Sequence, residues 1–230
     1  MKHSILAFFF MLMLTLLPIF HAFGQADFGL RIAPNVGWMK PNAEGYYSDG
    51  ARIGFSWGFV AEFPIANNHR VGSGFNIIYS NGRLSYTEER VVNTVTHEGE
   101  LRRNYHLEYL EIPLLLRLRT ADDGKAVFYA TIGLGTGFRL DAHATDTFES
   151  GTMTILEDKA KITDEINLLR HSLLVGLGLE YAVSGNTRII VGLQFNNGFT
   201  DVLKGQNSVN QAINHNGAPN FVEMNFGLLF

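Results

Sequence analysis

The sequence contains no cysteine and few charged residues. Its 230 residues include Cys 0 and 17% charged side chains, with a formal net charge of −4. The absence of cysteine excludes a disulfide framework, a cysteine-ligated zinc site and a cysteine nucleophile. The low, slightly acidic charge disfavours a broad basic surface, so no nucleic-acid partner is expected. Hydrophobic residues at 46% and aromatic residues at 12% argue against disorder.

Long apolar runs are also missing, apart from one at the N-terminus. Lys2 precedes an uncharged run at 5–20, and a small-x-small site, Ala22-Phe23-Gly24, follows it. This order is typical of a secretory signal peptide, so we expect residues 1–24 to be cleaved. A transmembrane anchor is the alternative, but the run is shorter than the ~18 residues of a spanning helix and contains Pro18. Residues 25–230 are then expected to form one domain.

The rest of the chain alternates between apolar and small or polar residues. From 53 to 63, each odd position is apolar and each even position up to Gly58 is polar or glycine. A period of two predicts a strand with one apolar face. The same pattern recurs in seven other segments, which gives eight expected strands: 28–38, 53–63, 71–79, 110–118, 128–140, 169–181, 189–195 and 222–230.

The connections between these strands alternate in length. Those at 64–69, 120–126 and 182–187 are short, whereas those at 40–51, 87–104, 142–166 and 200–220 are long. This arrangement predicts an all-β fold, an eight-stranded antiparallel up-and-down transmembrane β-barrel with short periplasmic turns and long external loops in a cell outer membrane. Residues 88–103 suit a hairpin that extends beyond the membrane.

A soluble barrel or sandwich is the alternative fold. It is disfavoured because the non-apolar strand face is rich in glycine rather than charge, and solvated strands avoid glycine whereas a crowded barrel interior requires small side chains. Aromatic residues near the strand ends suit two interfacial girdles. We assign to them Phe28, Trp38, Phe63, Tyr79, Tyr105, Phe128, Tyr181, Phe221 and Phe230.

The polar face predicts a network of charges in the barrel lumen. Buried charges without partners are costly, so these residues should form ion pairs that fill the lumen rather than line an ion path. The expected pairs are Glu62 with Arg31, Glu180 with Arg188, Glu111 with Arg139, and Asp141 with Arg170. The expected network comprises Arg31, Arg52, Glu62, Glu111, Arg117, Arg139, Asp141, Arg170, Glu180, Arg188 and Glu223.

Catalytic patterns are sparse. No pair of histidines has metal-ligand spacing on one strand face, and the adjacent His171 and Ser172 point to opposite faces of a strand. We therefore expect no enzymatic activity, no metal and no cofactor. The final strand places Phe226, Leu228 and Phe230 on one face, which is similar to the signal that the barrel-assembly machinery recognises. That machinery and outer-membrane lipid are the expected partners.

Three segments resemble the PorT family, small outer-membrane β-barrel proteins of Bacteroidota. They are Tyr-Leu-Glu-Ile-Pro-Leu at 109–114, Gly-Leu-Gly-Leu-Glu-Tyr at 176–181, and Phe-Asn-Asn-Gly-Phe-Thr-Asp-Val-Leu at 195–203. The resemblance implies a non-enzymatic component or accessory of type IX protein secretion, and of gliding where gliding is present, with other secretion components as possible partners. The alternative is a structural or adhesion-type small barrel without a role in secretion.

Overall fold

A computed structural model describes residues 26–121 and 124–230 of the chain. The expected signal peptide at 1–24 lies outside the described residues. The elements are β1 (Asp27–Pro41), β2 (Tyr47–Ser48), β3 (Arg52–Ala66), β4 (His69–Val92), β5 (Val95–Arg119), β6 (Ala126–Ser150), β7 (Met153–Lys161), the 3-10 helix η2 (Thr163–Glu165), β8 (Leu169–Ser184), β9 (Thr187–Gly198) and β10 (Gly217–Leu229).

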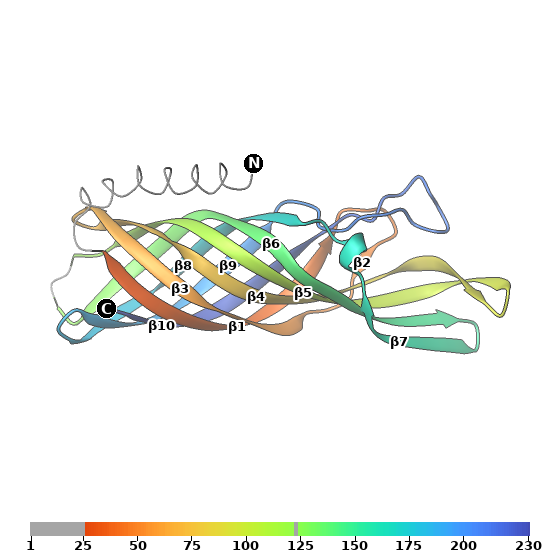
Figure 1. Cartoon of the computed structure of the whole chain (residues 1–230), viewed down its shortest axis with the longest axis horizontal. Coiled ribbons are helices and arrows are strands. Elements are labelled where there is room, and N and C mark those ends of the chain that lie inside the picture. The colour runs from red at the N-terminus through yellow and green to blue at the C-terminus, as the bar shows by residue number, and fades with distance from the viewer. Residues whose placement is uncertain (1–25, 122–123) are drawn as a thin grey trace, which may run out of the picture.

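Eight of these strands close into an antiparallel ring (Figure 1). The order is β1, β3, β4, β5, β6, β8, β9 and β10, and β10 pairs again with β1. Strands β2 and β7 lie off the ring and pair with β4 and β6. The predicted eight-stranded up-and-down barrel is confirmed. Within the described residues, no helix is long and apolar enough to cross a membrane.

The barrel exposes its apolar face to the outside. Phe55 is 40% exposed and Leu114 is 61% exposed, whereas the neighbouring Ser56 is fully buried. A soluble barrel would have the opposite arrangement, with apolar side chains inside. The apolar band therefore suits contact with lipid, which is the orientation that the alternation predicted.

The two ends of the barrel differ (Figure 1). At one end the strands are joined by short turns, whereas at the other β4 and β5 continue into a long hairpin with a two-residue turn at Asn93 and Thr94. Both turn residues have positive φ, 49° and 69°, as a tight hairpin turn that matches strand twist requires. We call these the short-turn end and the hairpin end.

Two of the four expected long loops are largely strands, which corrects the prediction of loops at 87–104 and 142–166. Residues 87–104 continue the β4–β5 ladder, as the suggested hairpin at 88–103 requires, and residues 142–161 form the end of β6 together with β7. The inward side chains of this extension form an apolar core with the loops that cover it. The core includes Tyr46, Leu84, Tyr86, Leu101, Tyr105, Phe148, Ile166, Val202 and Leu203.

Candidate functional site

The lumen is packed by placing large side chains against glycines. A Cβ atom built on Gly178 or Gly192 would lie 2.4 Å from the hydroxyl oxygen of Tyr129, so the tyrosine occupies the space that both glycines leave. Gly58 leaves space in the same way for Asn76, whose Oδ1 atom would lie 2.5 Å from such a Cβ. At these three positions the absence of a glycine side chain admits a neighbouring side chain, which is the role that the sequence suggested for the glycine-rich face.

At the short-turn end, the lumen contains a dense cluster of ion pairs. Glu62 Oε1 lies 2.5 Å from Arg117 Nη1, and the same nitrogen lies 3.2 Å from Glu180 Oε1. Glu180 Oε2 lies 2.8 Å from Arg119 Nη2 and 3.7 Å from Arg188 Nε. The full cluster comprises Asp27, Glu62 and Glu180 with Arg70, Arg117, Arg119 and Arg188.

Glu223 organises a second group nearer the middle of the barrel. Its Oε1 atom lies 2.6 Å from Arg31 Nη2 and accepts a hydrogen bond of 3.0 Å from the Gln194 amide. Its Oε2 atom accepts a 3.1 Å bond from the Ser56 hydroxyl. These bonds come from β1, β3 and β9 and compensate the buried carboxylate, so they link three strands to β10.

A third group joins Glu111 and Arg170, whose side chains are 1% and 0% exposed and lie 3.2 Å apart. Ser172 and Asn196 donate to the same carboxylate at 3.3 and 3.1 Å. The Arg170 guanidinium also lies near the rings of Tyr109 and Phe221, at 5.8 and 5.5 Å from their centroids. This is the most deeply buried ion pair of the lumen groups described here.

Three expected members lie outside these groups. Arg139 donates to the backbone carbonyls of Thr163 and Ile166. Asp141 pairs with His143 at 3.4 Å, and its side chain is 44% exposed. Arg52, at the beginning of β3, donates to the side chain of Asn104 at 3.3 Å. Including these three residues in the lumen network is therefore wrong.

The physical reason at Asp141 is a β-bulge in β6, which comes after Arg139 and leaves that residue on the inward face. Opposite Glu108 and Tyr109 of β5 stand Asp141 and Arg139, so Leu140 is an extra residue. An extra residue reverses the face on which later side chains lie. Asp141 consequently faces outward, although it has an odd position number like the inward residues of β6 before the bulge.

The expected pairing is correct for one pair and wrong for three. Glu180 does lie by Arg188. Glu62 pairs with Arg117 instead of Arg31, and Glu111 pairs with Arg170 instead of Arg139. The expectation assumed partners on adjacent strands, whereas Glu62 on β3 and Arg117 on β5 have β4 between them. Long arginine side chains cross the narrow lumen and skip a strand.

Sequence reasoning missed a further group within the hairpin-end core. Asp146, fully buried, is held by Arg90 at 2.5 Å and by Arg103 at 2.7 Å, and Arg103 also lies 2.5 Å from Glu165. The residues fall on segments that were expected to be loops. The detectable signal is the continued alternation of Leu101, Arg103 and Tyr105, which predicts one face of a strand.

A polar contact fixes the β9–β10 loop, residues 199–216, over this core. The Tyr46 hydroxyl lies 2.7 Å from His215 Nδ1 and accepts a 3.0 Å bond from the Asn207 amide. Asn207 also donates to the carbonyl of Thr87 at 2.8 Å. Burial, followed by the nearby positive charge of Arg103, lowers the pKa of His215, which favours the neutral form of its ring.

The remaining expected features are the C-terminal assembly signal, the aromatic girdles and the absence of a metal site. Phe226, Leu228 and Phe230 are 38%, 45% and 54% exposed on the outer face of the last strand. Recognition of these residues by the assembly machinery stays a prediction. Tyr105 and Phe221 are buried, so their assignment to the aromatic girdles is wrong. Among residues 26–121 and 124–230, no cluster of three or more histidine, aspartate and glutamate residues could hold a metal ion.

The closed ring, the outward apolar band and the charged lumen define a small membrane β-barrel. The family model described as "Outer membrane protein beta-barrel domain" matches residues 21–204. The chain belongs to this family, and it is an outer-membrane protein. In such barrels the short turns lie in the periplasm, so the hairpin end is external.

Several solved structures are similar to this chain. Neisserial surface protein A is 13% identical, with a TM-score of 0.47 over 90% of this chain and 98% of that one. OprG from Pseudomonas aeruginosa is 12% identical, with a TM-score of 0.44 over 89% and 96%. Ail of Yersinia pestis is 13% identical, with a TM-score of 0.39 over 90% and 100%. A search of curated proteins gave no match.

Proposed function

We propose that this protein is a non-enzymatic component or accessory of type IX secretion that acts by contacting other outer-membrane components through its external sheet. The observation that carries a contact function is the ordered extension of β4, β5, β6 and β7 beyond the barrel (Figure 1). Twelve residue steps from Ser80 to Val92 give a projection of about 40 Å along the strand. The resemblance to PorT-family segments supports secretion as the process.

The closed lumen supports a contact role over a transport role. The apolar core at the hairpin end covers the lumen on the external side, and the ion-pair cluster fills it at the short-turn end. An eight-stranded barrel has an interior that side chains can fill. In planar bilayers we expect no stable conductance steps, and well-resolved steps would promote a channel function above the contact function.

The tip of the extension offers a surface for such contacts. Val91 and Val95 at the β4–β5 hairpin are 71% and 54% exposed, and Leu156 on β7 is 68% exposed. Exposed apolar side chains on a rigid support are a common feature of protein-binding surfaces. The same tip equally suits a surface-interaction or adhesion role without secretion, which remains the second candidate.

Gene deletion separates the two candidates. If the protein serves secretion, cells lacking it retain cargo proteins that carry a C-terminal sorting domain, and the wild-type gene restores their export. If secretion is intact and binding of the cells to surfaces changes, the adhesion role is favoured and the secretion proposal is rejected.

A shortened hairpin tests whether the extension carries the function. The variant lacks residues 89–98, and a two-residue Asn-Gly turn joins Glu88 to Gly99, which already face each other in the ladder. The control is Thr94→Gly, which keeps the full hairpin and relieves the positive φ of 69°. We expect both variants to insert and show heat-modifiable migration, with cargo export lost only in the shortened variant. Full rescue by the shortened variant would place the function elsewhere.

A further inference from the structure

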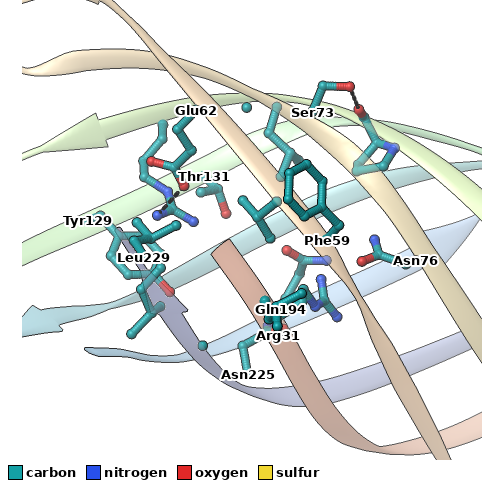
Figure 2. Close-up of a pocket in the computed structure, with 18 of the residues that line it drawn as sticks. Arg31, Phe59, Glu62, Ser73, Asn76, Tyr129, Thr131, Gln194, Asn225 and Leu229 are labelled. Carbon is teal, nitrogen blue, oxygen red and sulfur yellow. Dashed lines mark hydrogen bonds and ion pairs between the residues drawn. The ribbon is translucent and has the colours of Figure 1, made fainter. Parts of the chain in front are cut away.

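The lumen contains a small chamber between the ion-pair cluster at the short-turn end and the group around Glu223 (Figure 2). Its volume is about 50 Å³, and side chains from β1, β3, β4, β9 and β10 are among those that surround it. Part of its wall is apolar, formed by residues such as Val60, Leu115 and Ile190. We call this cavity the lumen chamber.

Polar atoms of four side chains that line the chamber lack a hydrogen-bond partner in the described protein. They are Arg31 Nε, Glu62 Oε2, Asn76 Oδ1 and Asn225 Oδ1. Glu62 and Asn76 are 1% and 2% exposed, so bulk solvent does not reach them. A buried polar atom without a hydrogen-bond partner destabilises the folded state, so four such atoms around one cavity indicate a bound polar species.

The chemistry of these atoms identifies the species. Three are acceptors and one is a donor, and they come from four different strands, so the occupant must donate in several directions. A free cation is disfavoured because the guanidinium groups of Arg31 and Arg117 also line the chamber. A water requires roughly 10–15 Å³ of this kind of volume, so about three to five waters fit.

We propose that the lumen chamber is a specific hydration site, whose ordered waters join the Arg31–Glu223 pair to the Glu62–Arg117 pair. Arg31 Nη2 and Glu62 Oε1 hold the close ion pairs, at 2.6 and 2.5 Å. The waters bind Arg31 Nε and Glu62 Oε2, which has no hydrogen bond within the described part of the chain and whose ion-pair contact with Arg70 Nη1 is a long 4.0 Å. The waters hydrogen-bond the polar atoms that the apolar part of the wall cannot satisfy. The two charged groups thereby form one connected network.

Solution NMR of the folded barrel in lipid nanodiscs tests this site. We expect water cross-peaks of the sign that indicates long residence at the side-chain amides of Asn76 and Asn225. Asn196 is the matched control. It is fully buried, it does not line the chamber, and its side-chain amide donates a 3.1 Å hydrogen bond to Glu111. Loss of a water signal at both chamber asparagines, with the barrel folded, would overturn the proposal.

A crystal structure supplies the second measurement. Ordered waters within hydrogen-bond distance of Asn76 Oδ1 and Glu62 Oε2 are expected. Xenon occupies dry apolar cavities, so crystals pressurised with xenon should show none in the chamber. Xenon density there would show that the chamber is dry and reject the hydration site. Gly72→Ala provides a folded variant with a smaller chamber, because the added Cβ would lie 3.6 Å from Leu115 and 3.9 Å from Glu62. We expect it to lose at least one water, and an unchanged water set would contradict the assigned volume.

Discussion

Removing the negative charge of Glu111 should destabilise the barrel strongly. In Glu111→Gln, the Arg170 guanidinium keeps its bonds to Asn196 and to the Pro219 carbonyl but loses the carboxylate 3.2 Å away. Removing one partner of a buried ion pair costs about 3–5 kcal/mol because the other charge remains buried. The retained bonds favour the lower end of this range, so we expect a loss of about 3 kcal/mol.

The double variant should recover much of this loss. Arg170→Met alone leaves the carboxylate with Ser172 and Asn196, and together with Glu111→Gln it removes both charges from the lumen. Replacing a buried pair as a unit is often close to neutral, whereas coupled residues show interaction energies of roughly 0.5–3 kcal/mol. We expect the coupling here near the upper end of that range.

Reversible urea unfolding in lipid vesicles measures these free energies, because folded and unfolded barrels migrate differently on gels. The control cycle uses Arg102 and Glu149, which lie 3.4 Å apart with side chains 41% and 43% exposed. An exposed pair of this kind is worth at most about 1 kcal/mol. If the Glu111 and Arg170 effects simply add, within about 0.5 kcal/mol, the buried charges do not depend on each other and the lumen is open to water.

Three other changes test separate parts of the structure. Phe55→Arg should reduce the folding free energy in vesicles by about 2–4 kcal/mol because it places a charge against lipid. Lipid-soluble reagents should label a cysteine that replaces Phe55 but not one that replaces Ser56. The opposite labelling would show that the assignment of the lipid and lumen faces is inverted. Gly178→Ala places a Cβ 2.4 Å from a tyrosine hydroxyl and should cost about 1–3 kcal/mol. In Gly72→Ala the nearest contact of the added Cβ is 3.6 Å, so it should cost clearly less than Gly178→Ala; equal losses would contradict the packing. The lowered pKa of His215 favours its neutral form in the folded state. Its contribution to the stability of the folded loop is therefore present above about pH 6.5 and is lost as pH falls through the lowered pKa. Proteolysis of the β9–β10 loop should increase at pH 5, and an identical acid response in His215→Asn would exclude this group.

Alternation predicted the barrel because lipid imposes the same rule on each strand: every second side chain faces hydrocarbon. This rule applies only within the membrane, so the strands expected from the sequence end at the membrane boundary. On β4 the outward apolar residues include Phe75 and Tyr79, whereas the apolar residues further along, Leu84 and Tyr86, face inward. Their parity changes although β4 continues without interruption. A search for one constant apolar face therefore ends the strand where the surroundings change from lipid to water.

β6 shows why parity alone cannot locate this boundary. Phe138 and Leu140 face outward, whereas Ala142 and Phe148 are buried in the apolar core at the hairpin end. All four nevertheless occupy even positions. The bulge at Leu140 reverses the face while the parity is preserved. Nothing in the local sequence announces an extra residue here. The pairing register with β5 was needed to place Asp141 outside the lumen.

Several residues of the segments that resemble the PorT family lie in the packed lumen of the barrel. Tyr109 and Glu111 belong to the group around Arg170, Glu180 belongs to the short-turn cluster, and Asn196 donates to Glu111. Buried side chains of this kind specify how the strands of a narrow barrel pack, and a partner at the cell surface cannot touch them. The likeness therefore supports the barrel directly and secretion only through the family as a whole. A secretion contact has to involve residues outside the lumen, such as the exposed Phe199 of the third segment or the hairpin at 89–98. The shortened hairpin tests the second of these surfaces.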